Sequence, residues 1–195
     1  SHIWDSWADE NGSIGKAYGY QLGVKHKYKE GMFDQVDRVL YDLKNNPFSR
    51  RIMTNIYNHH DLSEMGLYPC AYSMTFNVTE GKNGKLVLNG ILNQRSQDVL
   101  TANNWNVVQY SVLLHMFAQV CDMEVGEFVH VIADAHIYDR HIPLVKELIT
   151  RELRRSGSIP ISKISMISQP MMSALITTRR TSRSRVFPLQ YEVMI

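Results

Sequence analysis

Residues 106–123 constrain the fold of this chain more than any other segment, because they would form a helix that is apolar around most of its circumference. The apolar positions are Val107, Val108, Val112, Leu113, Leu114, Met116, Phe117, Ala118 and Val120. A helix of this kind must be covered by other elements rather than by water. We therefore predict a buried central helix around which the rest of the chain folds.

A β-hairpin with one buried face is predicted to follow Cys70. Apolar side chains alternate there with small or polar ones, at Tyr72, Met74, Phe76 and Val78. The Lys82-Asn83-Gly84 turn leads into a second apolar run over residues 85–88. Alternation on both sides of a glycine-containing turn is the usual signature of a hairpin.

Three more segments complete the predicted elements. Apolar residues at helical spacing over residues 33–43, followed by Asn45, Asn46 and Pro47, predict a helix that ends at this stop signal. Residues 128–135 are predicted to form a buried strand and residues 142–150 an amphipathic helix. Since helices and strands mix without regular alternation, we predict an α+β fold with a mixed sheet.

Length and composition indicate one domain in a reducing compartment. A chain of 195 residues with 44% apolar content can bury one substantial core. It contains no apolar run of about 18 residues and opens without a signal-peptide pattern, so we expect a soluble, cytoplasmic protein without a membrane partner. The two cysteines, Cys70 and Cys121, are then expected to be reduced.

The formal charge of +2 hides an asymmetry along the chain. Residues 1–150 hold 13 Lys and Arg against 17 Asp and Glu, whereas residues 151–195 hold 8 against 2. The basic character thus belongs to the last part of the chain and does not argue for a nucleic-acid partner. Residues after 151 also lack any period of 2 or 3.6, and the run TTRRTSRSR cannot form a core.

Cys70 is a candidate nucleophile because Pro69 restricts the backbone just before it. The plainer interpretation is a small buried apolar residue, as most intracellular cysteines are. A nucleophilic thiol needs positive charge nearby, and the candidates are Arg50, Arg51 and Arg95. Their distance from Cys70 does not follow from the sequence.

Arginine side chains also suggest phosphate binding. The pair Arg50-Arg51 lies between a helix stop and a strand, and Arg95-Ser96 follows the next strand. Guanidinium groups bind phosphate through two charge-assisted hydrogen bonds, which one lysine cannot copy. The alternative for any such pair is a solvated surface.

Two other groupings favour structural explanations. His130, His136 and His141 together with Asp134 invite a metal interpretation, but their spacing fits no zinc motif, so we predict no metal. Trp4 and Trp7 are spaced to share one helix face, for which core packing or a surface contact is the usual explanation.

Taken together and in order, these motifs resemble the thymidylate synthase family. The matching stretches are IWDSWADENG with AYGYQLG, SRR, LYPC, NQRSQDV with NNWN, and EFVHVIADAHIYDRH. They cover about residues 3–151, and an ordered set over that length is far more specific than any single motif. The resemblance implies the family's α+β fold, with its mixed sheet and buried central helix, incomplete in this chain.

The resemblance implies methylation of dUMP to dTMP, with methylenetetrahydrofolate as carbon and hydride donor. Cys70 would add to carbon 6 of the uracil ring, which makes carbon 5 able to attack the one-carbon unit. Arg95 would supply the positive field beside the sulfur, and Tyr18 would assist proton removal from carbon 5. Asp98 would bind the pterin ring and take part in catalysis.

The same resemblance implies a dUMP site and a symmetric homodimer. Arg95 and Ser96 would bind the phosphate, and His136 with Tyr138 would bind the ribose hydroxyl. Asn106 would recognise the uracil edge, since an amide donates to one ring position and accepts from its neighbour. Arg50 and Arg51 would reach the phosphate in the other subunit's site.

The implied folate site has an apolar wall formed by Ile3, Trp4, Trp7 and Trp105, with Asp98 on the pterin. The chain departs from the family pattern beside these ligands. It has TANNWN where the family commonly has an LGLPFN-like loop, and Ala133 where a glycine is common.

Both ends depart from the family. Members begin earlier, with a phosphate-binding arginine and a glutamate that have no counterpart in this sequence, and they end in WINP and FYDFT-like segments. Residues 157–175 can be back-translated so that the neighbouring frame encodes WINPDIKDFYDFTADDVSL. We therefore expect residues 1–151 to be a partial thymidylate synthase domain and residues 152–195 to be a frameshifted, poorly ordered tail, with the shift between about 151 and 156.

Two rival functions remain open. One is a catalytically inactive remnant that folds, dimerises or binds dUMP without turnover. The other is a pyrimidine hydroxymethylase, which Asn106 disfavours because the related cytosine enzymes place an acid at that position.

Overall fold

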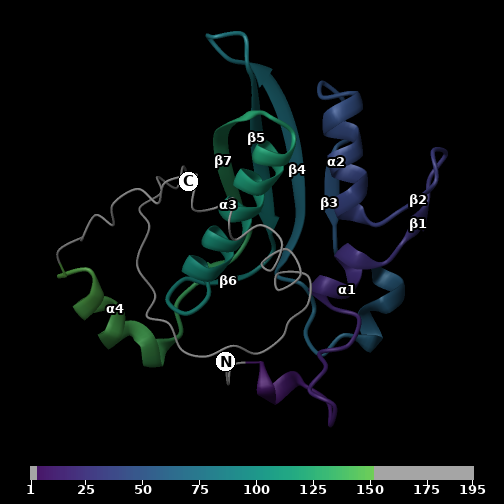
Figure 1. The fold of residues 1–195 in the computed structure, drawn as a ribbon. Coiled ribbons are helices and arrows are strands. Elements are labelled where there is room, and N and C mark those ends of the chain that lie inside the picture. The colour runs from purple at the N-terminus through teal and green to yellow at the C-terminus, as the bar shows by residue number, and fades with distance from the viewer. Residues whose placement is uncertain (1–3, 152–195) are drawn as a thin grey trace.

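The computed structural model describes residues 4–151 and places a four-stranded mixed sheet at the centre of the molecule (Figure 1). The strands are β3 (Met53–Asn55), β4 (Ala71–Glu80), β5 (Leu86–Gln94) and β7 (Glu124–Ile132), in the order β3-β4-β5-β7. The β3-β4 and β4-β5 pairs are antiparallel, whereas β5 and β7 are parallel. The predicted hairpin and the α+β class are thus confirmed. Ile3 and the tail after 151 lie outside the described residues, so the predictions about them stay predictions.

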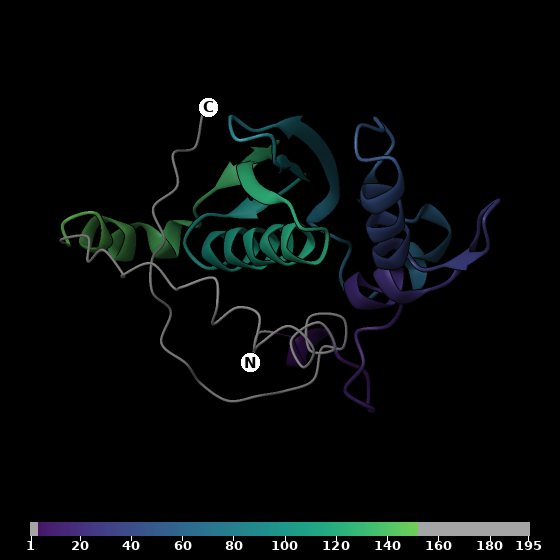
Figure 2. The ribbon, with the colours of Figure 1, turned by 45° about the horizontal axis from the view of Figure 1, so that its top comes forward.

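Helix α3 (Asn103–Val120) connects the parallel strands β5 and β7 and covers one face of the sheet (Figure 2). Phe76 and Phe117 lie with ring centroids 5.3 Å apart at the centre of this contact. Gly90 on β5 leaves no room for a side chain under the helix, since an added Cβ would lie 2.6 Å from Met74 of β4 and 3.3 Å from Leu114 of α3. The predicted central helix is therefore present, shifted by three residues toward the N-terminus.

The other face of the sheet is open among the described residues. Strand β7 was predicted to be buried, but its alternate residues Val129 and Val131 are 44% and 48% exposed. Strand register places Val129 beside Ile91, Ile91 beside Thr75, and Thr75 beside Met53. The prediction of a buried strand is wrong because a continuous apolar run does not show whether one or two layers cover it.

The circumference of α3 gives a second correction. Its buried residues are Val107, Tyr110, Ser111, Leu114, Met116, Phe117 and Ala118, whereas Trp105 and Val120 at its ends are exposed. The helix is thus buried along the side that contacts the sheet rather than on most sides. No helix within residues 4–151 is both long and apolar enough to cross a membrane.

Helix α2 (Gln35–Asn45) packs beside the sheet through Val36, Val39 and Leu43. The Asp34 side chain accepts a hydrogen bond from the Asp37 backbone N–H at 2.8 Å and so caps the first turn. This helix confirms the prediction for residues 33–43, apart from Phe33. That residue belongs to the short pair β1 (His26–Lys27) and β2 (Met32–Phe33).

Three short elements bring the N-terminal segment close to the chain that leads into β4. These are the 3-10 helix η1 (Asp5–Trp7), the helix α1 (Tyr18–Gly23) and the 3-10 helix η2 (His59–Glu64). An antiparallel bridge joins Gly15 to Met65. The chain before α1 and the chain before β4 are thereby held side by side.

A β-bulge interrupts the β4-β5 register at the first residues of β4. Ala71 pairs with Gln94 and Ser73 with Asn93, so Tyr72 is the extra residue. Bulges of this kind are frequent next to functional sites, where they redirect a side chain. This one lies directly after Cys70.

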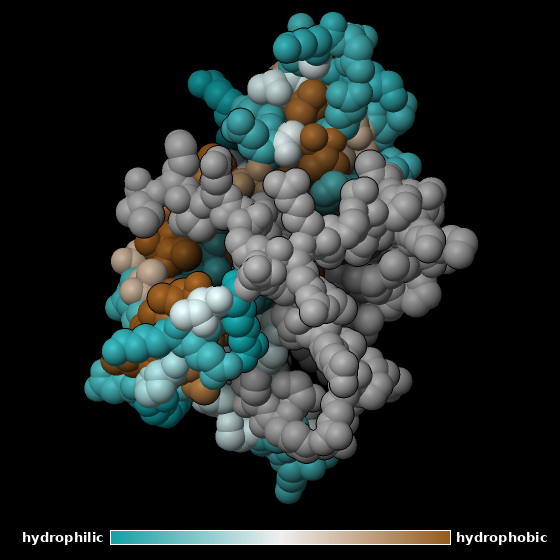
Figure 3. All heavy atoms as spheres, turned by 90° about the vertical axis from the view of Figure 1, so that its left-hand side faces the viewer, coloured by the Kyte–Doolittle hydropathy of each residue, from teal (hydrophilic) through white to brown (hydrophobic). Residues whose placement is uncertain are grey.

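The last described elements extend away from α1 and α2 (Figures 1 and 2). Strands β6 (Gln97–Asp98) and β8 (Ala135–His136) form a parallel pair, followed by η3 (Asp139–His141) and α4 (Ile142–Leu148). Figure 3 looks onto this side, where apolar patches interrupt the hydrophilic surface. The helix predicted for residues 142–150 is confirmed, but it has no buried residue.

Candidate active site

Cys70 and Arg95 meet because they lie at the same end of one antiparallel strand pair. Cys70 precedes β4 and Arg95 follows β5, and the residues inside them, Ala71 and Gln94, are register partners. The Arg95 backbone N–H donates to the Cys70 carbonyl oxygen at 2.9 Å. Arg95 Nη2 lies 4.0 Å from Cys70 Sγ. An adjacent guanidinium stabilises a thiolate, which is the nucleophilic form of cysteine.

Two backbone carbonyls hold the Arg95 side chain in this position. Arg95 Nε donates to the Pro69 oxygen at 2.9 Å, and Nη2 donates to the Tyr68 oxygen at 3.0 Å. The chain just before Cys70 thus binds the arginine, and Pro69 limits the conformations of that chain. Sulfur and guanidinium are fixed relative to each other by the same backbone segment.

Tyr18, the first residue of α1, lies against the cysteine backbone. Its hydroxyl oxygen accepts a hydrogen bond from the Cys70 N–H at 3.1 Å. Burial, together with the neighbouring cysteine, raises the pKa of Tyr18 to about 12. The Trp4 ring meets the Tyr18 ring edge-on at 5.8 Å, and Trp7 meets Trp4 at 6.1 Å. Tyr18 thus contacts Cys70, Trp4 contacts Tyr18, and Trp7 contacts Trp4.

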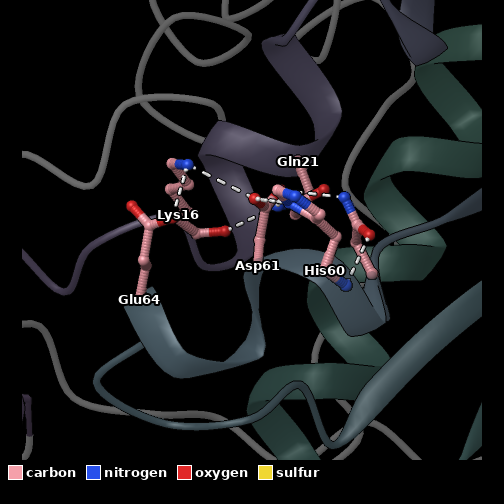
Figure 4. Close-up of polar contacts among 6 residues, drawn as sticks. Lys16, Gln21, His60, Asp61 and Glu64 are labelled. Carbon is pink, nitrogen blue, oxygen red and sulfur yellow. Dashed lines mark hydrogen bonds and ion pairs between the residues drawn. The ribbon is translucent and has the colours of Figure 1, made fainter.

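A buried carboxylate anchors the helix that carries Tyr18 (Figure 4). Asp61 on η2 accepts hydrogen bonds from Gln21 of α1 at 2.9 Å and from Lys16 at 3.3 Å. Gln21 also donates to the Lys16 carbonyl oxygen at 3.0 Å. Hydrogen bonds from Gln21 and then from His60 lower the pKa of Asp61 to about 2. The charged carboxylate therefore ties the start of α1 to the segment that leads to Cys70.

Side-chain amides line the sheet end next to Arg95. Gln94 Nε2 donates to the Ser96 carbonyl oxygen at 2.9 Å and to Asn106 Oδ1 at 3.3 Å. Gln94 Oε1 lies 2.8 Å from His130 Nε2. Asn106 on α3 and Ser96 after β5 thus belong to one hydrogen-bonded group, although they are ten residues apart in the sequence.

His136, Tyr138 and Asp98 form a second group at the β6-β8 pair. Asp98 and His136 are register partners, and His136 Nδ1 lies 3.0 Å from Asp134 Oδ1. The rings of His136 and Tyr138 meet edge-on at 5.2 Å. The parallel ends of β5 and β7 thereby bring the NQRSQD and DAHIY motifs to the same edge of the molecule.

The Asp98 carboxylate is bound by its own turn. Its Oδ2 accepts from the Thr101 hydroxyl at 2.6 Å, and Oδ1 accepts from the backbone N–H groups of Leu100 and Thr101. Burial alone would raise the pKa of Asp98, but the Thr101 and Leu100 hydrogen bonds outweigh it, so the pKa is lowered. Asp98 is thus a charged carboxylate that also shapes the loop before α3.

Arg50 and Arg51 are not brought to this site. Both are exposed in the turn between α2 and β3. Met53 pairs with Thr75, so Arg51 lies level with residue 77 of β4, roughly seven residues or about 20 Å from Cys70. Trp105 is exposed on the first turn of α3. Ile3 lies outside the described residues.

Three features of the site were not predicted from the sequence, namely Gln94, Asp61 and the placement of His130. Gln94 precedes Arg95 and lies two residues after Leu92, on the same buried face of β5. A polar residue at a position expected to be buried was the signal that could have identified it. His130 had been considered only as a metal ligand. Among residues 4–151, no group of three or more His, Cys, Asp or Glu side chains is arranged to hold a metal.

Comparisons with known proteins agree on one family. A family model described as thymidylate synthase matches residues 1–178. Thymidylate synthases of Bacillus subtilis subsp. natto and of Bacillus phage phi3T are each 47% identical over 152 residues, which is 77% of this chain and 53% of theirs. Thymidylate synthase 1 of Bacillus amyloliquefaciens is also 47% identical, with 64% of its length covered.

A solved structure gives the same result for the fold. The thermostable thymidylate synthase A from Bacillus subtilis superposes with a TM-score of 0.71 and 44% sequence identity. The match covers 78% of this chain and 53% of that one. The chain thus spans about half the length of most of the curated relatives that it matches.

Proposed function

This chain belongs to the thymidylate synthase family, and we propose that it contributes the nucleophile and the dUMP-binding surface for converting dUMP to dTMP. One observation carries the proposal. The Arg95 guanidinium is held by the carbonyls of Tyr68 and Pro69 so that Nη2 lies 4.0 Å from Cys70 Sγ. A preorganised cation beside a half-buried thiol is what nucleophilic attack on an electron-poor ring carbon requires.

In the proposed reaction, Cys70 Sγ forms a bond to carbon 6 of the uracil ring. The carbon 5–carbon 6 electron pair moves onto carbon 5 and the carbonyl at carbon 4, so carbon 5 becomes nucleophilic. Methylenetetrahydrofolate, as co-substrate, supplies the carbon and the hydride. Carbon 5 bonds to the methylene carbon as one of its two carbon–nitrogen bonds breaks. Tyr18 assists removal of the carbon 5 proton as the second carbon–nitrogen bond breaks, which leaves an exocyclic methylene on the ring. Hydride transfer from the tetrahydrofolate makes this methylene a methyl group, while Cys70 leaves carbon 6, the ring double bond re-forms and dihydrofolate is released.

The substrate contacts proposed for dUMP follow the two polar groups of the site. Arg95 and Ser96 bind the phosphate, Asn106 recognises the uracil edge, and His136 with Tyr138 binds the ribose hydroxyl. The proposal is supported by the position of these residues at one edge of the sheet, near the ends of β5 and β7. For folate, Trp4 beside Tyr18 offers an aromatic wall next to Cys70. Trp7, Trp105 and Asp98 are proposed to extend the folate site.

We propose that the working unit is a homodimer built on the open sheet face. Ile91, Val129 and Val131 form an exposed apolar patch there, in continuous register with Met53. A two-fold axis through such a face makes it self-complementary. Arg50 and Arg51, about 20 Å from their own Cys70, would then be free to reach the phosphate in the second subunit.

The function is tested by incubating the chain with 5-fluoro-dUMP and methylenetetrahydrofolate, then measuring its intact mass. We expect a covalent adduct at Cys70 that Cys70→Ser abolishes. Cys121→Ser is the matched control, because Cys121 is half-buried at the end of α3 and outside the site, and it should keep the adduct. Binding of dUMP by an ordered dimer without any adduct would instead favour the inactive remnant.

The dimer is tested separately by sedimentation. Ile91→Lys places a charge on the open face, where it meets water in a monomer and the partner's apolar patch in a dimer. We expect the mass to fall from dimer to monomer. A monomeric mass for the wild-type chain as well as for Ile91→Lys would refute the proposed interface.

A further inference from the structure

His130 is a half-buried polar residue for which the proposed chemistry has no use. It lies on β7 in register with Leu92 of β5, on the side of the sheet that α3 covers. Its Nε2 lies 2.8 Å from Gln94 Oε1. Its Nδ1 is buried and has no hydrogen-bond partner among residues 4–151. A buried ring nitrogen without a hydrogen-bond partner needs an explanation.

The direction of the His130–Gln94 hydrogen bond follows from the groups around Gln94. The Ser96 carbonyl can only accept, and it lies 2.9 Å from Gln94 Nε2. The amide oxygen of Gln94 must therefore face His130, and His130 must donate from Nε2. Burial lowers the pKa of His130, which favours the neutral ring with Nδ1 unprotonated.

The orientation of the Gln94 amide in turn determines the orientation of the Asn106 amide. Gln94 Nε2 also donates to Asn106 Oδ1 at 3.3 Å, while Gln94 itself is 2% exposed. If the Asn106 amide turned over, its NH2 would face the NH2 of Gln94 and neither could accept. The hydrogen bond from Gln94 therefore fixes which end of the Asn106 amide is oxygen and which is nitrogen.

The orientation of Asn106 determines which pyrimidine it accepts. Uracil presents an N3–H donor beside the O4 acceptor, whereas cytosine presents an N3 acceptor beside an amino donor. An amide held in one orientation matches the first pattern, and the reversed amide matches the second. Discrimination between the two bases thus depends on what prevents the amide from turning.

We propose that His130 is a positioning residue for substrate specificity, which acts through Gln94 to hold Asn106 in the orientation that favours uracil over cytosine. The inference rests on the proposed dUMP function, since it assumes that Asn106 contacts the pyrimidine. In this proposal β7 contributes to base selection although His130 itself does not contact the substrate. Loss of the His130 donor would leave Gln94 Oε1 unpaired, so that the Ser96 carbonyl oxygen alone would hold the Gln94 amide in this orientation.

The first test requires no nucleotide. In the full chain labelled with 15N at histidine, long-range 1H–15N spectra distinguish the two neutral tautomers. We expect His130 to carry its proton on Nε2, with Nδ1 showing the shift of an unprotonated nitrogen. A proton on Nδ1 alone would overturn the proposal, because His130 would then accept from Gln94 and the amide order would reverse.

The second test compares dUMP and dCMP binding by calorimetry in three variants. His130→Leu removes the donor, and we expect the dUMP-to-dCMP affinity ratio to fall about threefold to tenfold, the worth of one hydrogen bond. His130→Gln should restore the ratio, because its amide nitrogen reaches the position of Nε2. Phe128→Leu is the matched control, since Phe128 lies on the same strand with its ring 6.2 Å from His130 and has no hydrogen bond to Gln94.

The outcomes separate the two proposals. A wild-type chain that binds neither nucleotide contradicts the proposed function, and the specificity role is refuted with it. Wild-type preference for dUMP that His130→Leu leaves unchanged, in a variant that remains folded, overturns only the role of His130. An equal fall in the ratio for Phe128→Leu would likewise show a packing effect rather than a positioning one.

Discussion

Tyr18→Phe tests whether the tyrosine hydroxyl holds the backbone at the nucleophile. The substitution removes one oxygen, the acceptor that lies 3.1 Å from the Cys70 N–H. A buried N–H without an acceptor costs about 1–3 kcal/mol. Cys70 is only half-buried, so water can reach part of the site, and we expect the free energy of unfolding to fall by about 1–2 kcal/mol. For a chain of this length that corresponds to a Tm lower by about 2–8 °C.

Tyr110→Phe supplies the matched control, because Tyr110 is also buried but its hydroxyl is not the acceptor of the Cys70 N–H. Its unfolding free energy should change by less than about 0.5 kcal/mol. Urea denaturation followed by circular dichroism measures both variants under the same conditions. Equal destabilisation by the two substitutions would refute the reasoning, because the loss would then come from removing a hydroxyl in general. Retention of the adduct by Tyr110→Phe but not by Tyr18→Phe would extend the result to chemistry.

Three further substitutions test the supporting structure. Asp61→Asn removes a carboxylate whose pKa is lowered from 3.8 to about 2, chiefly by the hydrogen bond from Gln21. Because the charged carboxylate stabilises the fold, the free energy of unfolding of the wild-type chain should fall between about pH 4 and pH 2. Urea titrations over this pH range should show a shallower fall in the variant. Gly90→Val adds a branched side chain against Met74 and Leu114, so thermal unfolding should show a loss of about 1–3 kcal/mol from overpacking. Leu114→Ala opens a cavity beside Gly90 and should lower the unfolding free energy by about 2–5 kcal/mol, whereas a loss below 1 kcal/mol would contradict the packing described.

Local patterns were enough to predict the hairpin that carries Cys70 and Arg95. The alternation after Cys70 and the turn at 82–84 predict the hairpin, and a hairpin necessarily brings the residue before its first strand close to the residue after its second. The proximity of Cys70 and Arg95 thus follows from the hairpin once its length is known. The sequence already placed Arg95 directly after the second strand, and β5 does end at Gln94, but the register that sets its distance from Cys70 did not follow from the pattern.

Contacts between distant segments could not be predicted in the same way. The Gln94–His130 hydrogen bond depends on the parallel register of β5 and β7, which α3 sets by connecting them. The Gln21–Asp61 contact depends on how two irregular segments lie side by side. Neither arrangement leaves a periodic trace in the sequence. The roles of Arg50 and Arg51 stay predictions, since they concern a second subunit.

Because of the bulge at Tyr72, the number of residues between Cys70 and the core residues of β4 cannot change without turning the Cys70 side chain to the other face. From Ser73 onward, β4 sends alternate side chains into the α3 contact, and the extra residue shifts the phase of everything before it. Deletion of Tyr72 would leave Met74 and Phe76 in place but turn the preceding residue over, so that the thiol would face away from the guanidinium. Loops elsewhere in such a chain can change length over evolutionary time. An insertion or deletion of one residue here would instead preserve the packing of the core but remove the thiol from the guanidinium.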